Sequence, residues 1–410
     1  MSIATLRRAV IRGLLAWLTT IASVAATVVV ADARRERGLA QGRFPRSRPA
    51  PVPVGDSTVQ VYTYGEDLFA AMLYAIRAAH GQILLETYIW KDDAVGAAFK
   101  RELELAAGRG VAVYVIFDSF ANLVVPRPFK RFAPGVHVLA YPLAPWPLHP
   151  FHVRSYARDH RKILVVDGAT AFVGGYNIGA AYATEWRDTH ARLTGPQAAE
   201  VENVFVDFWN AHRTRGLPAL PYDRTRAWDP HVNVHRNDPP MLIFPIRTTY
   251  LEAIDRASRR IYLTHAYFVP DRVILRALIH AAERGVDVRI LMPERSNHVL
   301  ADWLARGAYE RCLAAGIRLL LYQDAMVHAK TATVDGVWST IGTANLDRLS
   351  LAGNFEVNVE VYDAPFAAQM EEIFADDATR CREVTREEWR RRPLTWKLAE
   401  AILVPLRPLL

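Results

Sequence analysis

Two stretches of this 410-residue chain decide its fold: HRKILVVDGATAFVGGYNIG, which begins at His160, and HAKTATVDGVWSTIGTANLD, which begins at His328. At a constant shift of 168 positions, a histidine, a lysine, an Asp-Gly pair, a glycine and an asparagine all coincide. Reactive residues kept at one spacing are not a packing pattern, so the stretches indicate two copies of one functional unit. The paired residues are His160 and His328, Lys162 and Lys330, Asp167 and Asp335, and Asn177 and Asn345.

The repeat extends beyond these two motifs. ILLETYIW (83–90) resembles IYLTHAYF (261–268), and GRGVAVYVIFD (108–118) resembles ERGVDVRILMP (283–293). In both copies an apolar strand, a helical segment ending in Arg-Gly and a Val-rich strand follow one another. Strands that alternate with helices predict βαβ units and a mixed or parallel sheet. We therefore expect an α/β fold made of two related halves.

The spacing within each motif predicts a shared surface. In a strand, residues i and i+2 project from the same face, so the histidine and the lysine point the same way. The Asp-Gly pair fits a hairpin turn, and the returning strand then brings the asparagine beside them. Two such surfaces that meet around a pseudo-two-fold axis would gather two imidazoles, two ammonium groups and two amides. This is a site for a single tetrahedral anion.

Two histidines at a phosphate can divide the chemistry. One neutral imidazole attacks phosphorus and becomes a phosphohistidine, while the other, protonated, gives a proton to the leaving alcohol and later acts as a base. Asp188 and Glu356 follow the two asparagines by eleven residues and could hold the far ring nitrogens. Asp167 and Asp335 belong to the catalytic motif, but a turn-forming role is at least as well supported because they lie at hairpin tips. Two lysines can neutralise a phosphodiester, so we expect neither a metal nor another cofactor.

Composition narrows the class of protein. With 51% hydrophobic and 23% charged residues, the chain is neither disordered nor fibrous. Two cysteines, Cys312 and Cys381, exclude a disulfide framework and a Cys-rich zinc site. A net charge of +7 suits a polyanion or an anionic membrane surface but is modest for a nucleic-acid binder.

Three apolar segments of the chain indicate that the protein acts at a membrane. Residues 13–31 carry no charge and are long enough to cross a bilayer, with arginines on both sides. We interpret them as a single-pass anchor in the bacterial cell membrane, with a cleaved signal peptide as the alternative and the orientation left open. Residues 120–153 are apolar and aromatic, which favours a lipid over a nucleic acid, with a loop packed on its own core as an equal alternative. Residues 396–410 fit either an amphipathic segment on the bilayer or a docked helix.

The paired motifs, together with LLETYIWKDDAVG (84–96), WRDTH (186–190) and IGTANLDRLSLAGNFEVNVEVYD (341–363), resemble the phospholipase D superfamily. Within it they are most similar to bacterial cardiolipin synthases, and the resemblance covers residues 59–365. It implies two α/β/α sandwich halves with the active site between them, His160 as nucleophile and His328 as general acid. The implied reaction moves a phosphatidyl group from one phosphatidylglycerol to another and releases glycerol. Hydrolysis to phosphatidic acid, or a phosphodiesterase or nuclease activity, is the alternative.

We accordingly expect phospholipid substrates and a membrane as partners, without nucleic acid and without an obligate protein partner. The predicted organisation is a membrane anchor or signal segment (1–31), a Pro-rich linker (32–58), a first half (59–215), a second linker (216–240), a second half (241–365) and an amphipathic tail (366–410).

Overall fold

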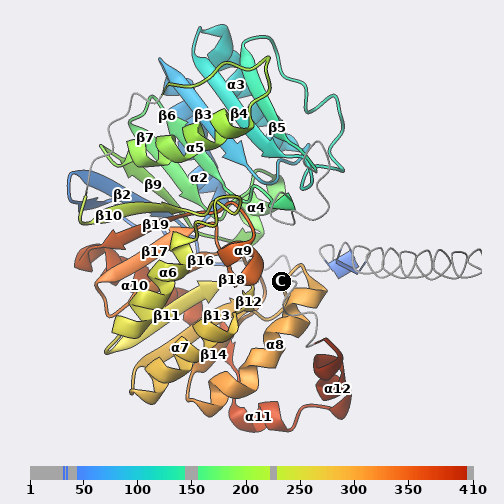
Figure 1. Ribbon diagram of the computed structural model, residues 1–410, viewed down its shortest axis with the longest axis vertical. Helices are drawn as coiled ribbons and strands as arrows, with labels where there is room; N and C mark the ends of the chain where they lie inside the picture. Colours follow the sequence, from blue (N-terminus) through green and yellow to red (C-terminus); the bar gives the residue numbers. More distant parts are fainter. Residues whose placement is uncertain (1–30, 33, 36–43, 144–155, 222–228, 404–410) are drawn as a thin grey trace, which may run out of the picture.

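The computed structural model describes residues 31–32, 34–35, 44–143, 156–221 and 229–403, and it contains two eight-stranded sheets (Figure 1). The first sheet has the order β1-β2-β9-β7-β6-β3-β4-β5. Its strands are β1 (Val52–Val54), β2 (Ser57–Tyr62), β3 (Gln82–Thr87), β4 (Ala112–Asp118), β5 (Val136–Tyr141), β6 (Ile163–Val166), β7 (Thr170–Gly174) and β9 (His190–Thr194).

The second sheet repeats the first. Its order is β10-β19-β17-β16-β11-β13-β14-β20, so seven consecutive strands match the first sheet from β2 to β5. In each sheet the three strands of the βαβ units are parallel and the remaining pairs are antiparallel, which confirms the mixed sheet that the sequence predicts. The strands are β10 (Val232–Arg236), β11 (Arg260–His265), β13 (Asp287–Pro293), β14 (Arg318–Tyr322), β16 (Lys330–Val334), β17 (Trp338–Gly342), β19 (Val357–Tyr362) and β20 (Cys381–Glu383).

Helices cover both faces of each sheet. On the first sheet, α2 (Gly65–Ala78) and α3 (Ala94–Gly108) pack on one face and α5 (Ala198–His212) on the other. On the second sheet, α6 (Pro245–Arg256), α7 (Arg272–Glu283) and α8 (Val299–Ala314) share one face, and α10 (Ala364–Ala378) packs on the other. The shorter helices are α4 (Ala180–Thr184), α9 (Arg348–Ala352), α11 (Arg386–Arg390) and α12 (Leu394–Leu403).

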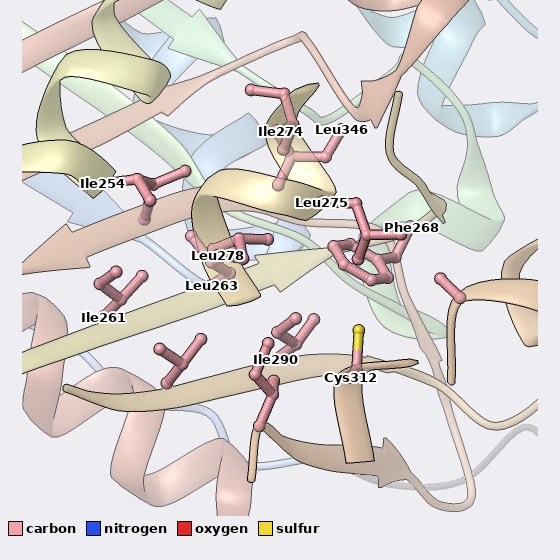
Figure 2. Close-up of a cluster of buried hydrophobic side chains, with 14 of the residues drawn as sticks. Ile254, Ile261, Leu263, Phe268, Ile274, Leu275, Leu278, Ile290, Cys312 and Leu346 are labelled. Atoms are coloured by element: carbon pink, nitrogen blue, oxygen red, sulfur yellow. The ribbon is translucent and has the colours of Figure 1, made fainter. Parts of the chain in front are cut away.

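The apolar periodicity of these elements builds the cores. Figure 2 shows the core of the second half, where Leu275 and Leu278 of α7 meet Leu263 of β11 and Ile290 of β13, with Cys312 of α8 buried beside them. A second cluster runs from the α5 face of the first sheet into β17, β19 and α10 of the second sheet. The two halves therefore share buried apolar surface, which fixes their edges against each other.

Several predicted boundaries differ from the structure. The predicted linker 216–240 contains β10, an edge strand of the second sheet, and the predicted linker 32–58 contains β1 and the first residues of β2. The segment predicted as a tail, 366–410, begins inside α10, whose Phe366 and Met370 are buried, and then supplies β20. The second half therefore extends past residue 365, because α10 is needed to cover its sheet.

Within the described ranges, no helix is both long and apolar enough to cross a bilayer. The predicted membrane segment, 13–31, lies outside those ranges except for its last residue.

Candidate active site

Short backbone pairings between the halves bring the two motifs together. Strand β8 (Trp186–Arg187) of the first half pairs in parallel with β15 (Met326–Val327) of the second, and the His328 N–H donates to the Arg187 carbonyl at 2.7 Å. On the symmetric side, Asp159 forms a bridge with Phe355, and the His160 N–H donates to the Phe355 carbonyl at 3.0 Å. Each histidine is thus fixed by backbone of the opposite half.

The same pairings exchange carboxylates between the halves. Glu356 of the second half lies with Oε1 3.0 Å from Nδ1 of His160, and Asp188 of the first half lies with Oδ2 2.6 Å from Nδ1 of His328. Because Nδ1 is engaged in both rings, Nε2 is the nitrogen turned away from the carboxylate. Both rings line one cavity of about 430 Å³.

The two lysines are buried beside the histidines. The Lys162 ammonium donates to the His160 carbonyl at 2.5 Å, and the Lys330 ammonium donates to the His328 carbonyl and lies 3.0 Å from Nδ1 of that ring. Burial lowers the pKa of Lys162 to about 7 and that of Lys330 to about 8. An anion between them would offset this burial and favour the charged forms.

The pKa shifts of the carboxylates differ between the two histidine–carboxylate pairs. Burial, reinforced by the lysines, lowers the pKa of His160 well below its usual value and that of His328 to about 3, while the Asp188 carboxylate acts on the pKa of His328 in the opposite direction. Burial alone would raise the pKa of Asp188, but the charge of Lys330 and the contact with His328 lower it overall. Burial raises the pKa of Glu356 to about 8. The carboxylate behind His328 is therefore the more firmly ionised of the two.

The two asparagines line the same cavity. Asn177 accepts a hydrogen bond from the Ile89 N–H at 3.1 Å through Oδ1, which leaves its NH₂ group as a donor. Asn345 is buried, and its Oδ1 has no partner among the described residues. Two imidazoles and two amides thus line one cavity, and the two lysines are buried beside the histidines rather than on the cavity wall.

Comparisons with known proteins agree with this geometry. The family model described as "Cardiolipin synthase, PLD-like domain" matches residues 72–209 and 250–378. The chain is 32% identical to the major cardiolipin synthase of Bacillus subtilis (strain 168), over 87% of this chain and 76% of that protein. It is 34% identical to cardiolipin synthase A of Pseudomonas entomophila (strain L48), over 82% and 72% of the two chains.

The chain belongs to the cardiolipin synthase family of phospholipase D-like proteins. This confirms the resemblance seen in the sequence and the prediction of a cardiolipin synthase-like phosphatidyltransferase. Among solved structures, the fold is similar to phosphatidylserine synthase of Haemophilus influenzae Rd KW20, with a TM-score of 0.67 and 15% identity over 92% of this chain and 99% of that chain. That likeness supports the two-half α/β fold.

The motif aspartates do not reach this cavity, contrary to their assignment as catalytic residues. Asp167 sits at the β6–β7 turn, where its carboxylate accepts from three successive backbone N–H groups that begin at His80, at 2.8–2.9 Å. Asp335, at the β16–β17 turn, accepts in the same way from three N–H groups that begin at Ser258. Both have positive φ, 50° and 55°, as a tight hairpin requires. Their positions indicate the turn-forming role.

Other residues around the site are not evident from the motifs. The ring of Tyr88 lies edge-on to His160 at 4.8 Å between centroids, and Trp186 lies 5.3 Å from the ring of His328. The buried guanidinium of Arg161 pairs with Glu86 and, at 3.1 Å, with Asp159. That network fixes the backbone on either side of His160. In the sequence, the position of Arg161 between His160 and Lys162 of the motif was the signal for this network.

Proposed function

We propose that the enzyme moves a phosphatidyl group from one phosphatidylglycerol to another through a phosphohistidine on His160. The observation that carries the proposal is the pair of imidazoles, each backed by a carboxylate of the opposite half, on either side of one cavity. The site suits a substrate with a single phosphate, because the two asparagines on the cavity wall and the two lysines buried beside the histidines offer donors and charge for one tetrahedral anion.

In the first step, Nε2 of His160 attacks phosphorus and forms a P–N bond. The P–O bond to the glycerol headgroup breaks, and His328, which enters this step as an imidazolium stabilised by Asp188, gives its Nε2 proton to that oxygen, so glycerol leaves. Lys162 and Lys330 bear the charge of the phosphate and of its transition state.

In the second step, the terminal hydroxyl of another phosphatidylglycerol loses its proton to His328, and its oxygen attacks the same phosphorus. The P–N bond breaks, His160 returns to its neutral form, and a diphosphatidyl glycerol, cardiolipin, is released. Two phosphatidylglycerols thus become one cardiolipin and one glycerol, with no net change in protons.

The carboxylates support this division of roles. The proton carrier becomes an imidazolium, which an ionised carboxylate at Nδ1 stabilises. Asp188, whose pKa the charge of Lys330 lowers against the effect of burial, meets that need at His328. Glu356, whose pKa burial raises to about 8, suits a histidine that attacks in the neutral form.

Two segments of the chain are suited to attach the enzyme to a membrane. We infer that residues 13–31 anchor the enzyme in the cell membrane and that α12 lies against it. Leu394, Leu398 and Ile402 recur every four residues along α12 and are 79%, 63% and 64% exposed, while its other side packs on α8. Flotation with phosphatidylglycerol vesicles should retain the full chain and a chain without residues 1–30, and it should lose that shorter chain when these three residues are serine.

The deciding experiment is product analysis of the detergent-solubilised protein with phosphatidylglycerol, in EDTA. We expect cardiolipin and glycerol in equal amounts. Phosphatidic acid as the sole lipid product would refute the transferase and leave a hydrolytic phospholipase D. No product at all would refute both.

The histidine roles need a separate test with a lipid that carries a good leaving group. His328→Ala should accumulate phosphohistidine, and His160→Ala should form none; the reverse pattern would exchange their roles. His235 offers a matched control, because its Nε2 pairs with Glu360 at 2.8 Å in a histidine–glutamate pair outside the cavity. His235→Ala should turn over normally.

A further inference from the structure

A second, larger cavity lies beside the active-site cavity. Its volume is about 680 Å³, and it is lined by the ends of β13 and β14 and by α8, α11 and α12, which lie together in the lower part of Figure 1. Tyr267 and Ala301 line both cavities. The ring of Tyr267 is 6.3 Å from that of His328, so one side chain separates the second cavity from a reacting histidine.

Two buried donors in this cavity lack acceptors. Nη1 of Arg306 and Nε1 of Trp389 have no hydrogen-bond partner within the described part of the chain. The Arg306 guanidinium lies 4.4 Å from the ring centroids of both Trp303 and Trp396, whose rings are 5.9 Å apart and nearly perpendicular, so it sits in the corner that they form. This cation–π contact leaves the N–H groups that point away from the rings free to bind oxygen atoms.

The other charged groups of the cavity wall are already matched. Each remaining arginine contacts a carboxylate, and each carboxylate contacts an arginine, so Arg306 is the lining arginine without such a partner in the described chain. The pairs are Arg382 with Glu294 and Glu388, Arg391 with Glu387, Arg392 with Glu400, and Arg35 with Asp302.

We propose that this second cavity binds the phosphate of the acceptor phosphatidylglycerol. The inference rests on the proposed function and gives the second substrate a place. A transferase that joins two anionic lipids needs a cation for each phosphate, and the active-site lysines serve only the donor. Phosphate oxygens would accept from Arg306 and Trp389, and the exposed apolar row of α12, on the helix that carries Trp396, offers a surface for the acyl chains. The headgroup hydroxyl would then reach the phosphohistidine past Tyr267.

The test separates donor use from acceptor use. In mixed micelles of varied phosphatidylglycerol content, glycerol release in the first turnover reports donor cleavage, and the ratio of cardiolipin to phosphatidic acid reports acceptor binding. Arg306→Gln should raise the phosphatidylglycerol content needed for half-maximal cardiolipin formation about tenfold, with first-turnover glycerol release unchanged. Trp389→Phe, which keeps the ring and removes the donor, should shift it in the same direction.

The matched control is Arg391→Gln, which alters a paired arginine of the same wall and should behave as the wild type. An unchanged ratio in Arg306→Gln would overturn the inference, and so would a parallel loss of glycerol release, which would place Arg306 on the donor or in the fold.

A binding measurement decides the matter if the wild type proves inactive. Inactive His160→Ala protein should bind two molecules of dihexanoyl-phosphatidylglycerol, and the double variant with Arg306→Gln only one. A single site in both proteins would refute the second cavity. Displacement of the second molecule by inorganic phosphate at equal affinity would refute a lipid site in favour of a free-phosphate site.

Discussion

The replacement Asp167→Asn distinguishes a turn-forming from a catalytic role for the motif aspartates. Asparagine keeps the shape and tolerates the φ of 50° at this turn. It also keeps one oxygen for the N–H groups of Gly81 and Gln82, at 2.8 Å each, but turns an NH₂ group toward the His80 N–H, now 2.9 Å from Oδ2. One charge-assisted hydrogen bond is lost and two become neutral, in a partly exposed turn. The cost should be about 2 kcal/mol in the free energy of unfolding.

Catalysis should survive this change. Asp167 is five residues from Lys162 along β6, which is roughly 16 Å at the rise of an extended strand. Urea unfolding followed by circular dichroism should show the lower stability, and kcat per folded molecule should stay within about twofold of the wild type, whereas loss of a general acid or base costs roughly 100-fold or more. The same change at exposed Asp92 is the control and should alter neither. A 100-fold lower kcat at unchanged stability would refute the turn-forming role.

Three further outcomes follow from the site. In steady-state assays, Asp188→Asn should lower kcat at least about 100-fold with little change in KM, because the imidazolium of His328 loses its counter-charge. A comparable rise in KM would contradict this. The kcat/KM for phosphatidylglycerol should fall as pH rises through about 7 to 8, because burial lowers the pKa values of Lys162 and Lys330 to about 7 and 8 and their protonated forms bind the phosphate; a profile flat to pH 10 would exclude that role. Turnover should persist in EDTA, since ammonium groups supply the positive charge, and loss of activity that Mg²⁺ restores would refute this.

The sequence predicts which residues form the site better than it predicts which of them contact one another. Spacing predicts that each histidine and lysine share one strand face and that the asparagine lies on the returning strand. The histidines and asparagines do line one cavity, but the histidines lie just before β6 and β16 and the asparagines just after β7 and β17. Spacing did not reveal that Asp188 serves His328, since that contact depends on the two-residue pairing of β8 with β15, too short to leave a periodic pattern. The motif aspartates were ambiguous because a hairpin tip selects the same residue that catalysis would.

The C-terminal boundary was wrong for a different reason. The polar motifs of the repeat end near Glu356, although helix α10 follows β19 as α5 follows β9. An apolar helix directly after this buried strand, which lies between β10 and β17, was a signal for the true boundary. Its residue Phe366 is fully buried, which a free amphipathic tail would not produce.

A difference between the two carboxylates lets a duplicated motif hold two different histidines. At the matched position the first half carries Asp188 and the second half Glu356, and each contacts the histidine of the other half. Here His160 is backed by a glutamate that Thr343 also contacts, at 2.5 Å, and His328 by an aspartate beside Lys330. The symmetric backbone therefore gives both rings the same geometry, while the crossed side chains give them different charge. Neither motif histidine takes its carboxylate from its own half, so the site forms only where the two halves meet.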